Sequence, residues 1–178
     1  MSLACALGMC AVAASLIVAR GWLGAAGSAL AILALAIAIV DRRTFIIPDQ
    51  LNLSACLVGL VAAALAAPGE PHVAILHAVL RATVVFLALF GFRAGYRRLR
   101  RRQGIGLGDV KLAGVAGVWL DWVDLPVAVD IAALAALATV LLRRLRGESL
   151  DMRAKLPFGA FLAPAIWLCW LLAASRRG

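Results

Sequence analysis

Long stretches without a single charged residue constrain this chain more than any other feature of its sequence. Four such runs approach or reach the roughly 17–25 residues that an α-helix needs to cross a bilayer: Leu3–Ala19, Trp22–Val40, Leu51–Ala67 and Phe158–Ser175. Hydrophobic residues make up 65% of the chain, whereas soluble domains contain about half. The chain is therefore expected to be an integral membrane protein.

Three further apolar stretches are less regular. Val79–Tyr96 has an arginine near each end, Arg81 and Arg93, where a long side chain can reach water from within the membrane. Val110–Leu120 is short, and Leu125–Leu142 contains an aspartate. Together the runs predict an all-α polytopic membrane bundle of about seven transmembrane helices, with a six-helix core and one additional N-terminal helix.

The first run also has the length of a signal peptide. No Lys or Arg precedes it, however, although the n-region of a signal peptide normally supplies one. We therefore expect Leu3–Ala19 to be retained as a helix. No repeat and no long linker divides the sequence, so residues 1–178 are expected to form a single domain.

Basic residues are concentrated in alternate loops. The net charge of +9 would suggest nucleic acid binding in a soluble protein. Here, however, 14 of the 18 basic residues lie within three segments, residues 42–43, 93–111 and 143–155. The positive-inside rule places these three segments in the cytoplasm. The expected partners are then membrane lipids and not nucleic acid, and Arg97–Arg102 is read as a topology determinant in contact with anionic lipid rather than as a substrate site.

The opposite loops contain few basic residues. The five tryptophans all fall towards that side, as an interfacial aromatic belt would. The acidic residues there, Glu70, Asp121, Asp124 and Asp130, are expected to be solvated. Arg176 and Arg177 are an exception to the charge rule if the helix count is seven.

The four cysteines and two histidines suggest no metal site and no cofactor. Cys5, Cys10, Cys56 and Cys169 lie in apolar runs without a Cys-x-x-Cys spacing, so neither zinc binding nor a disulfide framework is indicated. The histidines lack the spacing of metal ligands and are expected to be interfacial or packing residues.

Two aspartates stand where an apolar run meets a basic loop on the same predicted membrane face. Asp41 ends the second run and Asp109 precedes the fifth. A carboxylate close to hydrocarbon is costly, which makes it a candidate functional residue. Two adjacent carboxyls can share a proton, so that one acts as a base while the other donates, as in aspartic proteases. Transporters and proton relays also use such pairs, and the spacing alone does not decide between the two.

Glycines surround the second aspartate. Gly104, Gly106 and Gly108 remove three side chains within five residues, which lets another backbone approach closely. A protease needs such access because its substrate must be locally extended. The alternative is a flexible entry to the helix or a small-residue helix contact.

The segments Asp41-Arg42-Arg43-Thr44-Phe45-Ile46-Ile47-Pro48-Asp49 and Gly106-Leu107-Gly108-Asp109-Val110-Lys111 resemble the motifs of type IV prepilin peptidases, a family of Gly-x-Gly-Asp intramembrane aspartic proteases. The resemblance extends over about residues 22–175. It implies that Asp41 and Asp109 are the catalytic pair and that no metal or organic cofactor takes part. A third family-like stretch, Pro157-Phe158-Gly159, opens the last apolar run.

Other residues near the motifs have two interpretations each. Asp49, after Pro48, is expected to cap the following helix, with catalysis as the alternative. Lys111 could keep a carboxylate ionised or contact substrate, or it could reach the interface.

Longer relatives have an N-terminal region with paired Cys-x-x-Cys motifs linked to methylation. Because no such motif is present, the chain resembles the short form associated with tight-adherence (Flp-type) pili, although archaeal preflagellin peptidases share the core.

The resemblance therefore implies a multi-pass endopeptidase of the inner membrane. It would cleave the leader of prepilin or pseudopilin precursors at the cytoplasmic boundary, with its active site towards the cytoplasm. The alternatives are a small proton-coupled transporter or channel that uses both aspartates as a relay, and an inactive assembly partner with the same fold. The transporter predicts acids near the membrane midplane, whereas both aspartates lie at the ends of the predicted helices.

Overall fold

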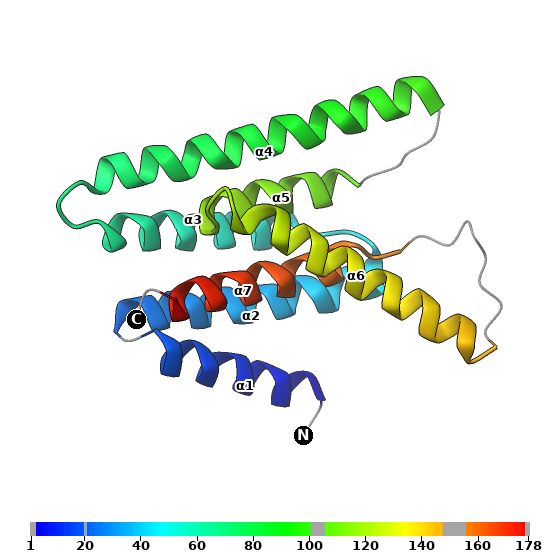
Figure 1. The fold of residues 1–178 in the computed structure, drawn as a ribbon, viewed down its shortest axis with the longest axis horizontal. Coiled ribbons are helices and arrows are strands. Elements are labelled where there is room, and N and C mark those ends of the chain that lie inside the picture. The colour runs from blue at the N-terminus through cyan, green and yellow to red at the C-terminus, as the bar shows by residue number, and fades with distance from the viewer. Residues whose placement is uncertain (1–2, 20, 101–105, 148–155, 177–178) are drawn as a thin grey trace.

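The computed structural model describes residues 3–19, 21–100, 106–147 and 156–176, and the regular structure within these ranges is entirely helical. The helices, in chain order, are α1 Leu3–Val18, α2 Trp22–Thr44, α3 Asp49–Ala66, α4 Pro71–Arg100, α5 Leu107–Trp119, α6 Asp124–Leu145 and α7 Gly159–Ser175. Successive helices run in opposite directions through one bundle (Figure 1). The all-α polytopic bundle predicted from the apolar runs is confirmed.

The alternating directions bring distant parts of the sequence to the same end of the bundle. The turn after α2, the start of α5 and the start of α7 lie together (Figure 1), and we call this end, marked by Phe45, Gly106 and Phe158, the Phe45 end. The opposite end is marked by Ala67 and Trp119, and we call it the Trp119 end. The two conspicuous aspartates both belong to the Phe45 end.

The helices differ widely in length. Among the described residues, α2, α3, α4 and α6 are long and apolar enough to cross a membrane. The fourth helix has 30 residues and extends well beyond the expected Val79–Tyr96 at both ends. In contrast, α5 has 13 residues, or about 20 Å at 1.5 Å per residue. It begins at Leu107 and is shorter than the roughly 30 Å hydrocarbon core.

The short α5 forms the centre of the core. Val110, Leu112 and Val118 are 0%, 1% and 4% exposed, and the helix packs against α3, α4 and α7. Gly117 allows the backbone of α4 to come close, because a Cβ placed on Gly117 would lie 2.7 Å from the Cα of Ala82. Such burial of apolar side chains on all sides fixes the body of α5 relative to its neighbours.

Two tryptophans lie in the core and not in the expected interfacial belt. Trp170 is 8% exposed, and its indole fills the space left by the missing side chain of Gly27. Trp119 packs edge-to-face against Trp170 with ring centroids 6.2 Å apart. The belt expectation was wrong for this pair, because glycines on neighbouring helices provide space for the rings. Trp22 and Trp122 are exposed, as a belt requires.

Arg81 is also placed differently from the expectation. Instead of reaching water, its guanidinium donates to the carbonyl oxygen of Gly117 over 3.2 Å and pairs with Asp121 over 3.1 Å. The side chain of Arg81 is only 17% exposed. Asp121, which was expected to be solvated, thus neutralises an arginine at the Trp119 end.

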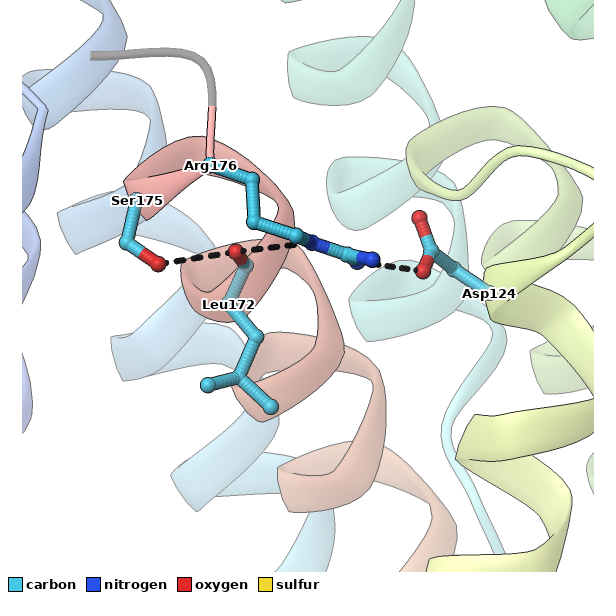
Figure 2. Close-up of polar contacts among 4 residues, drawn as sticks. All are labelled: Asp124, Leu172, Ser175 and Arg176. Atoms are coloured by element: carbon cyan, nitrogen blue, oxygen red, sulfur yellow. Dashed lines mark hydrogen bonds and ion pairs between the residues drawn. The ribbon is translucent and has the colours of Figure 1, made fainter.

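Asp124 has a similar role at the same end. Arg176 donates to its carboxylate over 2.7 Å, and the Asp124 side chain is 13% exposed, so the expectation of a solvated acid was wrong (Figure 2). The arginine also donates to the carbonyl oxygen of Leu172, which accepts a second hydrogen bond from Ser175. This pairing explains how an arginine is accommodated at the end of α7 that the charge rule assigns to the outside.

Candidate functional site

Asp41 lies in the last turn of α2 and is 4% exposed. The helix ends because Phe45 adopts a left-handed conformation with φ 55°, from which its N–H donates to the carbonyl oxygen of Asp41 over 2.9 Å. This is the usual way of ending a helix with an αL residue, here without the customary glycine. The chain then passes through Pro48 directly into α3. The tight reversal places Asp41 at the Phe45 end of the bundle, where its side chain is buried.

Asp109 is the third residue of α5, and Gly106 is the N-cap. The Asp109 carboxylate accepts a hydrogen bond from the backbone N–H of Gly106. An acidic residue at this position commonly reaches back to the N-cap in this way, and it lies at the positive end of the helix dipole. The N-cap hydrogen bond within α5 therefore helps to orient this carboxylate independently of contacts with other helices.

The start of α7 contacts both aspartates. The N–H of Ala160 donates to Oδ2 of Asp41 over 2.8 Å. The N–H of Gly159 is within hydrogen-bonding reach of both Asp41 and Asp109. The N-terminus of α7, which follows Pro157 and Phe158, thus supplies the backbone N–H groups of Gly159 and Ala160 to the aspartates, and N–H groups at a helix N-terminus commonly lack intrahelical partners. The sequence marked these residues only by resemblance, and the structure shows what they touch.

A cavity of about 280 Å³ joins the two aspartates. Its walls come from the end of α2, the turn that follows and the first turn of α5, and its lining residues are Asp41, Phe45, Ile46, Ile47, Asp49, Gly106, Leu107, Gly108, Asp109 and Lys111. The residues that were singled out 68 positions apart in the sequence therefore share one pocket. We call it the Asp41 pocket.

The electrostatics of the pocket favour the protonated form of Asp109. Asp109 lies outside the four helices that are long enough to cross a bilayer. Burial and the neighbouring charge of Asp41 raise its pKa to about 6, while the N–H groups of Gly106 and Gly159 oppose this rise. Two carboxyls that interact in this way lose their protons in separate steps. As pH falls through about 6, Asp109 consequently gains a proton that it can donate beside Asp41.

Ile47 determines how closely the elements of the pocket approach one another. It is 5% exposed and packs against two glycines. A Cβ on Gly108 would lie 3.2 Å from Cβ of Ile47, and a Cβ on Gly159 would lie 2.5 Å from its Cδ1 and 3.0 Å from Oδ2 of Asp41. Because Gly108 has no side chain, the turn between α2 and α3 can pack closely against the start of α5. Sequence reasoning missed Ile47, since its only signal was an apolar residue between two motif positions.

Asp49 and Lys111 form an ion pair at the rim of the pocket. Asp49 begins α3, with Pro48 as N-cap in an extended conformation. Its carboxylate accepts a hydrogen bond from Nζ of Lys111 over 2.6 Å, a different partner from the helix N–H groups expected for it. The side chains are 72% and 36% exposed, respectively. The residues singled out around the two motifs thus lie at the Phe45 end, except Gly104, which lies outside the described residues.

The other acids and histidines among the described residues lie outside the Asp41 pocket. Asp121, Asp124 and His77 line a second cavity of about 800 Å³ at the Trp119 end. Within the described ranges, no three His, Cys, Asp or Glu side chains gather closely enough to hold a metal ion.

Comparison with known proteins agrees with the motif analysis. Residues 28–141 match the Type IV leader peptidase family. The chain is 35% identical over 155 residues to a prepilin leader peptidase/N-methyltransferase of Burkholderia pseudomallei (strain K96243), which covers 86% of this chain and 48% of the relative. Proteins of the same name from Aeromonas hydrophila and Dickeya chrysanthemi are 29% and 36% identical over 90% and 72% of this chain, and over 53% and 44% of their own lengths.

The chain thus spans about half the length of the curated relatives that it matches. No solved structure matches it. The family match covers well over half of the chain and includes both aspartates of the pocket. The chain belongs to the type IV leader peptidase family.

Proposed function

We propose that the chain is an intramembrane aspartic endopeptidase that removes the leader peptide of type IV prepilin or pseudopilin precursors. One observation carries the proposal: Asp41 and Asp109, from helices far apart in the sequence, line one cavity and interact electrostatically. A pair of carboxyls that shares a proton is the equipment that hydrolysis of a peptide bond requires. The relatives named prepilin leader peptidases supply the substrate class.

The reaction needs no group beyond the pair and a water molecule. The ionised carboxylate takes a proton from water, whose oxygen attacks the carbonyl carbon of the scissile bond. The protonated carboxyl donates to the carbonyl oxygen. When the tetrahedral intermediate collapses, the C–N bond breaks and the amine leaves with a proton from the pair. The N–H of Ala160 fixes the orientation of the Asp41 carboxylate throughout.

The position of the pocket suits a substrate that is partly embedded in the membrane. Asp41 ends the long apolar α2, and the arginines nearest to it, Arg42 and Arg43, form the basic last turn of that helix. We infer that the Phe45 end lies at the cytoplasmic face of the inner membrane. An apolar segment of the precursor could then remain in the bilayer while the bond to be cleaved enters the pocket from the cytoplasmic boundary.

Co-expression tests the proposal directly. The chain is produced together with a prepilin from the same genome, and the pilin N-terminus is measured by mass spectrometry. We expect a mass decrease that corresponds to the leader, present with the wild-type chain and absent without it. An unprocessed precursor beside well-expressed, membrane-inserted wild-type chain would contradict the proposal for that substrate class.

The pH dependence of cleavage should follow the shared proton. Since Asp109 has a pKa raised to about 6, the pair loses its donor as pH rises through that value. We expect kcat/KM of purified enzyme to fall on the alkaline side with an apparent pKa near 6, because that profile reports groups of the free enzyme. A rate that stays constant from pH 5 to pH 9 would show that no such proton is needed.

A further inference from the structure

The first turn of α5 has few side chains that can fix its rotation. Gly106 and Gly108 have no side chains, and Leu107 is 40% exposed. The side chains that can hold this turn are therefore those of Asp109, the buried Val110 and Lys111. Because α-helical residues follow one another at 100°, Asp109 and Lys111 point to nearly opposite sides of the helix. A contact made by Lys111 therefore adds a restraint on the direction in which Asp109 points.

Lys111 has such a contact, and it reaches the other wall of the same pocket. Its Nζ lies 2.6 Å from Oδ1 of Asp49. Asp49 begins α3, two residues after Ile47, which packs against Gly108 and Gly159. The ion pair consequently joins the segment that follows Asp41 to the helix that carries Asp109. Both partners line the Asp41 pocket without being part of the buried pair.

We propose that the Asp49–Lys111 ion pair is a strap that fixes the rotation of the first turn of α5 and so keeps Asp109 directed at Asp41. Lys111 and Asp49 are then positioning residues, acting through Asp109 and not through contact with the substrate. The inference rests on the proposed peptidase function. Ion pairs with exposed partners contribute at most about 1 kcal/mol, so the strap limits the motion of one helical turn and contributes little to the stability of the fold.

The test compares Lys111→Met, Asp49→Asn and the charge-reversed double variant Asp49→Lys/Lys111→Asp. With purified enzyme and a purified prepilin in mixed micelles, each single variant should lose about fivefold in kcat, the factor that corresponds to 1 kcal/mol. KM and melting temperature should not change. The double variant should recover most of the loss, because opposite charges again face each other. Arg97→Met, which removes a positive charge from the last turns of α4, is the matched control and should behave as wild type.

Hydrogen exchange provides a readout that does not depend on cleavage. The N–H of Val110, bonded to the carbonyl oxygen of Gly106 over 3.3 Å, closes the first turn of α5. It should exchange faster in both single variants and return towards the wild-type rate in the double variant. The N–H of Leu120, bonded to Ala116 at the other end of the helix, should keep its rate.

The outcomes separate the strap from the proposed function. If wild type cleaves and the single variants match it in kcat, or if the double variant fails to recover, the strap is wrong and the peptidase proposal stands. A change confined to KM would place Lys111 against the substrate and also overturn the strap. If wild type cleaves no prepilin, the functional proposal fails, while the Val110 exchange rates still decide whether the ion pair holds the turn.

Discussion

Replacing Asp41 or Asp109 by asparagine should abolish leader cleavage, with a loss of at least about a thousandfold in kcat/KM. An amide cannot take the proton from water, nor can it hand a proton back to the leaving amine, so each single change removes one half of the chemistry. The asparagine side chain has nearly the same volume as the aspartate, so packing at the Phe45 end should be preserved. Cleavage is measured by the mass of the pilin N-terminus in cells and by initial rates with purified protein.

Asp49→Asn is the matched control for these two changes. It also removes a carboxylate from the same pocket. This carboxylate, however, lies at the exposed rim and is paired with Lys111. Its loss of activity should remain near fivefold. The three variants should reach the membrane in equal amounts. Full processing by either Asp41→Asn or Asp109→Asn would remove the mechanism, whatever the other variant does.

The second large effect is expected at Gly159. In Gly159→Ala the new Cβ would lie 2.5 Å from Cδ1 of Ile47 and 3.0 Å from Oδ2 of Asp41, so either the isoleucine or the carboxylate must move. We expect a loss of about a hundredfold in kcat, since a displacement of about 1 Å at a reacting group can cost that much. Gly108→Ala, whose Cβ would lie 3.2 Å from Ile47, should lose less, and Gly108→Val more than Gly108→Ala. Gly114→Ala makes only ordinary contacts, from 3.5 Å, and should be nearly neutral.

A double variant identifies which contact matters. Ile47→Val removes the Cδ1 atom that a methyl group at position 159 would meet. If Gly159→Ala acts by displacing Ile47, the double variant Gly159→Ala/Ile47→Val should regain activity. If it acts by displacing the Asp41 carboxylate, the double variant should stay inactive. Yield and melting temperature are measured in parallel, and losses of activity that merely follow losses of folded protein would show that the glycines serve packing alone.

The helical bundle and the two aspartates could be predicted because local properties encode them. Uncharged runs of sufficient length define helices in a membrane, and the basic loops place Asp41 and Asp109 on one face. Their meeting in one pocket is not encoded locally. The start of α7 provides N–H groups that reach both carboxylates, and Ile47 packs against glycines on α5 and α7. The approach of two such distant segments depends on packing that no pattern in either segment reveals.

The sequence-based expectations were wrong for side chains whose contacts lie far away in the sequence. An arginine near the end of an apolar run is ordinarily expected to reach water, but Arg81 finds Asp121, which is 40 residues away in sequence. Trp170 would suit an interfacial belt by its position, yet Gly27 provides space for its ring in the core. Asp49 was expected to cap α3, but its carboxylate accepts a hydrogen bond from Lys111 of α5 instead. In each case the deciding residue lies on a helix that the local sequence does not identify.

The two ion pairs at the Trp119 end have an electrical consequence for the whole molecule. Arg81 is neutralised by Asp121 and Arg176 by Asp124, whereas Arg42 and Arg43 lie at the Phe45 end. The arginines of these two pairs therefore add no net charge to the Trp119 end. An energised bacterial membrane is negative inside, and moving one elementary charge across it changes the energy by about 2.3 kcal/mol per 100 mV. The membrane potential thus favours the proposed orientation, in which the Phe45 end faces the cytoplasm.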